Sequence, residues 1–166
     1  MTVIVGYTQE TECSIYFDSA IADSDTILSS NTPKAFRHAG NGLVGVAGSW
    51  RVINLVSSLS RRKLTPQTIV DTLKNVKGED EAIHDMEILC AWPNRPLVII
   101  QSDFSIIEID SPYMAVGSGS AYALGFLEAC FQEDVAFSDE ELTGAVRVAA
   151  KYSTSVAEPV KSLHCA

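Results

Sequence analysis

The sequence predicts an α+β protein: a four-layer αββα sandwich of two antiparallel sheets, each covered on its outer side by a helix pair. Strand-like and helix-like segments occur in separate runs, in the order strands, two helices, strands, two helices, which is typical of α+β folds. Strands such as LCAW and LVII are apolar at successive positions, as expected when both strand faces are buried. The chain contains no repeat, low-complexity tract or linker, so residues 1–166 are expected to form one domain.

Antiparallel strands are expected in the first third of the chain. The segments 2–7 (TVIVGY) and 13–19 (CSIYFDS) are β-branched and apolar, and a polar TQETE turn separates them. Three further segments have strand-like composition: 25–30, 34–40 and 43–49. Asn41-Gly42 lies between the last two, and Asn-Gly is the strongest short hairpin signal. The last two segments are therefore expected to form a hairpin.

Helical periodicity begins in the next part of the chain. Apolar residues recur at helical spacing between Ser49 and Lys63. Thr65-Pro66 combines an N-cap with a proline in the first turn, and predicts a second helix that runs to about Val76. A charged loop is expected at 77–85. Four more strands are then expected: 86–92, 96–102, 105–110 and 113–118.

Two helices are expected near the end of the chain. The third is expected from Gly119 to about Gln132. The fourth begins with Ser138 and Glu141, which have the spacing of a capping box, and is expected to continue to about Val156. Residues 160–165 form a candidate last strand.

Composition excludes several classes of function. The formal net charge of -9 argues against a surface for nucleic acid or anionic membrane, because such surfaces need clustered Lys and Arg. The basic cluster 61–63 fits a helix end, where it complements the helix dipole. No apolar run approaches the about 20 residues of a membrane span, and no signal peptide is visible. Four scattered cysteines without a CxxC pair disfavour zinc and favour a reducing, cytoplasmic compartment. No metal or other cofactor is expected.

Thr2 is a candidate nucleophile. Methionine is commonly removed before a small residue, and removal of Met1 would give Thr2 a free α-amine beside its hydroxyl. A terminal amine has a pKa of about 8, so it can accept the hydroxyl proton at neutral pH. The plainer alternative is that Thr2 is only a β-prone residue in a first strand.

Asp18 and Lys34 extend this pattern, because equal steps of 16 residues separate Thr2, Asp18 and Lys34. Alone, Asp18 reads as a turn residue and Lys34 as an edge-strand lysine that deters aggregation. Together with Thr2 they resemble the proteasome β-subunit and HslV family of N-terminal threonine (Ntn) hydrolases, which has Thr, Asp and Lys at this spacing.

The resemblance extends over nearly the whole chain. LVGVAGS (43–49) resembles the family's strand that ends in a glycine beside the nucleophile. YMAVGSGSAYALGFLEA (113–129) resembles its strand, Gly-Ser-Gly turn and helix. The resemblance implies the Ntn-hydrolase fold, which agrees with the sandwich expected from the order of elements.

The resemblance also implies roles for individual residues. Thr2 Oγ would attack a peptide carbonyl, with the α-amine of Thr2 as the base. Lys34 would place a positive charge beside the hydroxyl, and Asp18 would orient Lys34 and balance its charge. Gly48 N–H would stabilise the oxyanion, and Ser118 would lie near the amine and help to relay its proton. Without the resemblance, Gly48 is a glycine that ends a strand and Ser118 is an N-cap of the third helix.

The implied pocket for the side chain before the scissile bond involves Ile21 and Val46, with Trp50 nearby, and suggests apolar or small substrate residues. One position departs from the family pattern. The family usually carries an acidic residue near the end of the fourth helix, whereas Lys151 best matches that position here. A lysine there would repel a protonated amine, unless the local structure differs; Thr154 would still supply a hydroxyl.

The resemblance implies homo-oligomeric stacked rings that enclose the threonines, peptide or unfolded protein substrates, and an ATP-dependent unfoldase partner. The chain itself has no GxxxxGK[ST] motif. Three hypotheses remain open: a self-compartmentalising threonine-type endopeptidase, a catalytically inactive assembly protein that keeps Met1, and an Ntn hydrolase of small amides.

Overall fold

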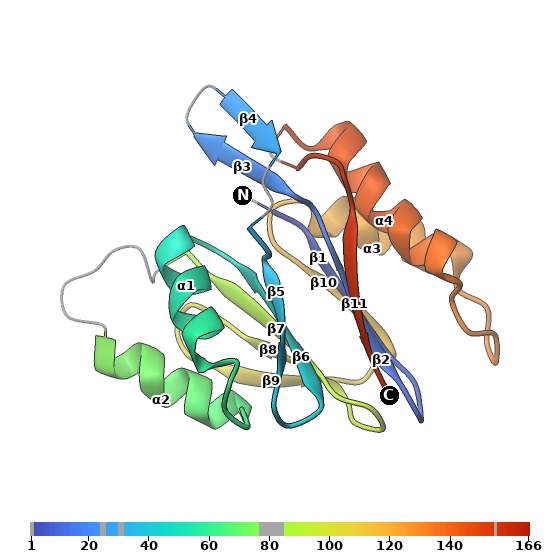
Figure 1. Ribbon diagram of the computed structural model, residues 1–166. Helices are drawn as coiled ribbons and strands as arrows, with labels where there is room; N and C mark the ends of the chain where they lie inside the picture. The colour runs from blue at the N-terminus through green and yellow to red at the C-terminus, as the bar shows by residue number, and fades with distance from the viewer. Residues whose placement is uncertain (1, 24–25, 30–31, 77–84, 155) are drawn as a thin grey trace.

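The computed structural model describes residues 2–23, 26–29, 32–76, 85–154 and 156–166. Figure 1 shows four layers: a helix pair, a sheet, a second sheet and a second helix pair. The two sheets face each other across the centre of the molecule, and the chain begins at one end of the space between them. The αββα sandwich predicted from the order of strands and helices is therefore confirmed.

One sheet has four strands in the order β10-β1-β2-β11, and all neighbours are antiparallel. Its central strands are β1 (Ile4–Thr8) and β2 (Cys13–Phe17), which form the first hairpin of the chain. The outer strands are β10 (Tyr113–Val116) and β11 (Lys161–Cys165). The predicted last strand therefore forms and pairs with β2.

The other sheet has five antiparallel strands in sequence order, β5 to β9. These strands are β5 (Ala35–His38), β6 (Gly42–Ala47), β7 (Glu87–Ala91), β8 (Leu97–Ile100) and β9 (Ile106–Ile109). The predicted hairpin around Asn41 is confirmed, because β5 pairs with β6 and Asn41 adopts the positive φ (53°) that such turns require.

A separate two-stranded ribbon lies at one end of the sandwich (Figure 1). It pairs β3 (Ala20–Asp23) with β4 (Thr26–Ser29). The sequence predicted a strand at 25–30 but missed β3, which is only four residues long and follows β2 after a two-residue break. The predicted loop at 77–85 falls, apart from its last residue, outside the described residues.

Each helix pair covers one sheet. Helices α1 (Trp50–Leu59) and α2 (Pro66–Val76) cover the five-stranded sheet, and α3 (Ser120–Cys130) and α4 (Asp139–Tyr152) cover the four-stranded sheet. The Ser138–Glu141 capping box is present at the start of α4. No helix in the described ranges is long and apolar enough to cross a bilayer.

Three helix boundaries differ from the prediction. Helix α4 ends at Tyr152, four residues before Val156, because the chain turns extended at Ser153. Helix α1 ends at Leu59, so the basic residues 61–63 lie beyond its last turn. Gly119, and not Ser118, is the N-cap of α3, and no side chain caps that helix. The side chain of Ser118 hydrogen-bonds with Thr2.

The core divides into three layers because side chains alternate along each strand. On β6, Val44 and Val46 point to the helices α1 and α2, whereas Leu43 and Ala47 point to the opposite sheet. Side chains alternate in the same way at the start of β1. Val3 and Val5 pack against α3 and α4, and Ile4 lies between the sheets. Burial on both faces explains why these strands read as continuous apolar runs.

The sheets approach each other closely at Gly45. A Cβ added at Gly45 would lie 2.5 Å from Ile4 Cγ2 in the opposite sheet. Gly125, on α3, has open space around the corresponding position. The two glycines therefore offer a matched test of how tightly the sheets pack.

We expect Gly45→Ala to lower the free energy of unfolding by about 1–3 kcal/mol, because the added methyl group must displace packed side chains between the sheets. Gly125→Ala is expected to be neutral or stabilising, because alanine favours helix and meets no neighbour. Urea denaturation at matched protein concentration would measure both. Equal effects of the two substitutions would show that the sheets have slack at Gly45.

Candidate active site

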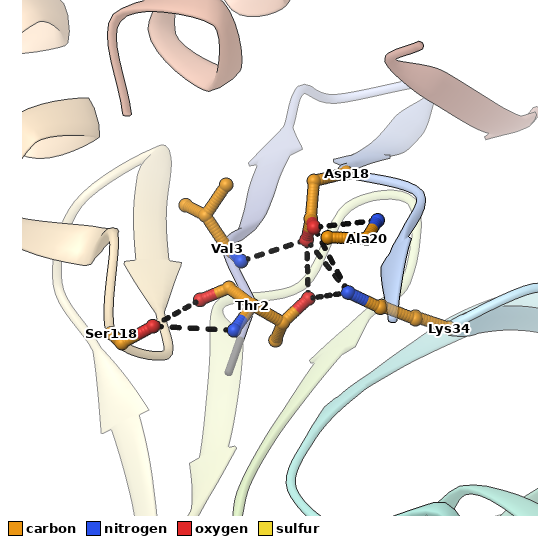
Figure 2. Close-up of polar contacts among 6 residues, drawn as sticks. All are labelled: Thr2, Val3, Asp18, Ala20, Lys34 and Ser118. Carbon is orange, nitrogen blue, oxygen red and sulfur yellow. Dashed lines mark hydrogen bonds and ion pairs between the residues drawn. The ribbon is translucent and has the colours of Figure 1, made fainter. Parts of the chain in front are cut away.

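Thr2, Asp18 and Lys34 come together at one end of the sandwich, although three different segments carry them (Figure 2). The β1–β2 register pairs Ile4 with Phe17. One residue further, Asp18 N–H donates to the carbonyl of Val3 at 3.4 Å. Hairpin pairing therefore places Asp18 beside the start of β1, which accounts for the first step of 16 residues.

Lys34 reaches the same point from the opposite sheet. It precedes β5, and its carbonyl accepts from Val46 N–H at 2.8 Å, which fixes its backbone beside β6. Its Nζ donates to Thr2 Oγ1 at 2.6 Å and to the two Asp18 carboxylate oxygens at 2.9 and 3.1 Å. The ammonium therefore joins the proposed nucleophile and the carboxylate in one contact.

The Asp18 carboxylate is saturated with donors. Besides Lys34, it accepts from the backbone N–H groups of Val3 and Ala20, both at 3.0 Å, and from the Thr2 hydroxyl in a short hydrogen bond (Figure 2). Its side chain is fully buried. A buried carboxylate needs such partners, because burying an unpaired charge is costly. Asp18 is thus held rigidly, and it holds Lys34 in turn.

Burial also sets the electrostatics of Lys34, which exposes only 2% of its surface. Burial lowers the pKa of its ammonium from 10.5, while the charge and hydrogen bonds of Asp18 act in the opposite direction. Lowering the pKa makes the proton easier to release. A cation beside a hydroxyl favours the alkoxide-like form of that hydroxyl, so the cluster can activate Thr2 Oγ.

The Gly-Ser-Gly turn after β10 forms hydrogen bonds with the backbone of Thr2. Gly119 N–H and Ser118 Oγ both donate to the Thr2 carbonyl at 3.3 Å, and Ser118 Oγ accepts from Thr2 N at 3.2 Å. Gly117 has a φ of +92°, and a Cβ there would lie 2.4 Å from the Thr2 carbonyl oxygen. Only glycine fits this conformation and this close approach.

An open cavity of about 810 Å³ adjoins Thr2. Thr2, Gly48, Gly117 and Ser118 all line it, so the structure brings the predicted oxyanion glycine and the predicted relay serine to one space. Three segments complete the lining: 47–49, 85–87 and 101–103.

Val46 and Trp50, two of the three predicted substrate-pocket residues, are not among the described residues that line this cavity. Val46 is fully buried beneath α1 and α2, because the alternation along β6 turns it away from the opposite sheet. Trp50 packs, partly buried, against the same cluster. The side chain of Ile21 lies outside the described residues. The assignment of Ile21, Val46 and Trp50 to a pocket for the substrate side chain therefore stays a prediction.

Sequence reasoning missed the acidic side of the cavity. Asp85, Glu87 and Asp103 line it, and Glu87 Oε2 accepts from Gly117 N–H at 2.7 Å. A polar residue at the start of an otherwise apolar strand was the signal for Glu87. Within the described ranges no group of three or more His, Cys, Asp or Glu residues is arranged to hold a metal ion.

Lys151 lies away from this site. Its side chain is exposed on α4, with Nζ 5.3 Å from the ring centroid of Tyr152, and it does not line the cavity. Thr154 is exposed and does not line the cavity either. Neither Lys151 nor Thr154 is therefore among the described residues that line the cavity, and an effect of Lys151 on the Thr2 amine stays a prediction.

Comparison with solved structures shows the same architecture over the full chain. The Thiobacillus denitrificans BPH, solved in complex with epoxomicin, superposes with a TM-score of 0.79 at 19% identity, covering 98% of this chain and 97% of that one. The chain has an HslV-like Ntn-hydrolase fold. A second structure of Thiobacillus denitrificans BPH gives a TM-score of 0.78 at 20% identity, with the same coverage. Eukaryotic HslV from Trypanosoma brucei gives 0.73 at 16% identity, covering 98% of each chain.

No family model matches the chain, and no curated protein matches it in sequence. The likeness to the HslV-like structures is therefore one of backbone architecture and not of overall sequence identity.

We expect Lys34→Met to lower the free energy of unfolding by about 3–5 kcal/mol, because it leaves a buried carboxylate without its cation. The double variant D18N/K34M is expected to lose less than the sum of the single variants. Arg147→Met is the control: Arg147 pairs with Glu158 at 3.9 Å on the surface, where both side chains are 58% exposed, so its loss should cost at most about 1 kcal/mol. Strict additivity of D18N and K34M in a denaturation cycle would contradict the coupling.

Proposed function

We propose that this chain is the subunit of a self-compartmentalising threonine-type peptidase that hydrolyses peptide bonds with Thr2 as an N-terminal nucleophile. The observation that carries the proposal is the contact of Lys34 Nζ with Thr2 Oγ1 at 2.6 Å, inside a buried cluster with Asp18. A lysine whose only task was to protect a sheet edge would extend into solvent. Here it exposes 2% of its surface and points at a hydroxyl.

The proposed reaction begins once the peptide bond before Thr2 has been cleaved. While Met1 is attached, the Thr2 nitrogen is an amide and cannot accept a proton. The free α-amine can take the Oγ proton, directly or through Ser118, whose Oγ lies 3.2 Å from Thr2 N. Thr2 Oγ then bonds to the substrate carbonyl carbon, and the carbonyl oxygen becomes an oxyanion. Gly48 N–H is proposed to stabilise that oxyanion.

The second half of the reaction returns the enzyme to its starting state. The protonated amine gives its proton to the leaving nitrogen, the carbon–nitrogen bond breaks, and an ester joins the acyl group to Thr2. The amine then takes a proton from water, and the resulting hydroxide attacks the ester and restores the threonine. Lys34 keeps its charge throughout and stabilises negative charge on Oγ, while Asp18 holds it in place.

Homo-oligomeric stacked rings are part of the proposal. The cavity beside Thr2 opens to the surface of the isolated subunit, so selection for unfolded chains must come from a chamber that assembly creates. An ATP-dependent unfoldase is the expected partner for feeding that chamber. Peptides and unfolded proteins are the proposed substrates, and the cytoplasm is the expected compartment.

Thr2→Ala is expected to abolish peptide hydrolysis down to the uncatalysed background without changing the assembly, because it removes the attacking oxygen. Thr2→Ser is the matched control and should retain activity, because serine keeps both the hydroxyl and the amine. Hydrolysis of fluorogenic peptides, with size-exclusion chromatography for assembly, would measure this. Intact-mass spectrometry of the wild type should show a chain that begins at Thr2.

Two outcomes would redirect the proposal. A mature wild type that keeps Met1 and hydrolyses nothing would favour the inactive assembly protein. Hydrolysis of small free amides, with no hydrolysis of peptides, would favour a small-amide hydrolase.

Epoxomicin, present in one of the BPH structures, is a further probe. It should raise the melting temperature of the wild type and not that of Thr2→Ala.

The pH dependence of kcat/KM is expected to be bell-shaped. Activity should rise as the α-amine loses its proton, at a pH of about 8. It should fall again as Lys34 loses its proton, and because burial lowers the pKa of Lys34, that fall should begin below the ordinary lysine value of 10.5. Initial rates measured from about pH 6 to about pH 11 would cover both limbs, because this range spans the reference pKa values of the two groups. A profile that stays flat to pH 11 would contradict the role of the Lys34 charge.

A further inference from the structure

Glu87 connects the two sheets beside Thr2. It is the first residue of β7 in the five-stranded sheet, and its Oε2 accepts from Gly117 N–H at 2.7 Å, just after β10 of the four-stranded sheet. Across its own sheet Glu87 pairs with Ala47, the residue before Gly48. One side chain thus connects the strand beside Gly48 to the turn that holds Thr2.

The turn that Glu87 holds controls the position of the Thr2 backbone. Gly117 adopts a φ of +92°, and the next two residues contact Thr2: Ser118 Oγ lies 3.2 Å from the Thr2 nitrogen, and Gly119 N–H donates to its carbonyl at 3.3 Å. Glycine adopts this φ without strain, but it is equally free to leave it, so the turn depends on its surroundings to stay in place. The hydrogen bond from Gly117 N–H to the Glu87 side chain supplies that restraint.

We propose that Glu87 is a positioning residue for the threonine nucleophile, acting through the Gly117–Gly119 turn that holds the Thr2 nitrogen and carbonyl. This inference rests on the proposed function for its effect on rate. Glu87 bonds directly to the turn, and it lines the same cavity as Thr2 and Ser118. It sets the distance between the amine that must accept a proton and the strand that carries the oxyanion donor.

The positioning role separates two substitutions that remove the same charge. Glutamine in place of Glu87 keeps a carbonyl oxygen that can accept from Gly117 N–H, whereas alanine removes the acceptor. We therefore expect Glu87→Ala to lower kcat about 10- to 100-fold with little change in KM, because small displacements of reacting groups have effects of this size. Glu87→Gln should keep most of the wild-type kcat.

Glu108 provides the matched control. It is an exposed glutamate on β9, in the same five-stranded sheet, and it does not line the cavity. Glu108→Ala and Glu108→Gln are expected to leave kcat and KM within about twofold of the wild type, because surface changes away from special features have small effects. Melting temperatures of all four variants would show that each one folds.

Hydrogen–deuterium exchange of the assembled protein tests the inference without relying on activity. The amides of residues 117–119 should exchange faster in Glu87→Ala than in the wild type, and at the wild-type rate in Glu87→Gln. Unchanged exchange in Glu87→Ala would overturn the inference, even if the wild type had no threonine-dependent activity. Equal losses of kcat in Glu87→Ala and Glu87→Gln would also overturn it, because charge and not the hydrogen bond would then matter. Failure of Thr2→Ala to reduce hydrolysis would overturn the proposed function. The exchange measurement on Glu87→Ala would still decide whether Glu87 holds the turn at residues 117–119.

Discussion

The buried contact of Lys34 with Asp18 is the interaction on which the rest of the site depends. Neither group could remain charged in the interior alone, because an isolated buried ion is far too costly. Each is charged because the other lies within 2.9 Å and because backbone donors complete the shell of the carboxylate. The pair therefore fixes its own geometry, and the Thr2 hydroxyl is held within it.

The fold brings these groups together by simple means. A hairpin of two adjacent strands places Asp18 beside the start of β1, and the facing sheet supplies Lys34. The Gly-Ser-Gly turn closes the opposite side of Thr2. Each of these groups lies just outside the end of a strand, where the backbone is not constrained by sheet pairing. The adjoining strand itself is packed in the buried core. Rigid strands and short loops together give the site its precision.

The sequence was informative wherever local signals and burial agreed. Hairpin turns, helix caps and apolar runs predicted nearly every element and the four-layer order. The resemblance to the proteasome β-subunit and HslV family pointed to Thr2, Asp18 and Lys34, which the structure brings into contact. Strand β3 was missed because four residues carry too little periodicity. The side of the sheet that Val46 faces was not visible in the sequence, because a strand buried on both faces does not reveal which residues point to which side. Glu87 was missed because its partner, Gly117, is 30 residues away and belongs to the other sheet.

The hydrogen bond from the nitrogen of Thr2 to Ser118 Oγ joins residues that are 116 positions apart in the chain. A ribosome therefore synthesises Thr2 long before Ser118, and β11, which pairs with β2, later still. Thr2 cannot reach its final hydrogen-bonded position until Ser118 has been made, and the sheet around it is not complete until β11 has paired with β2.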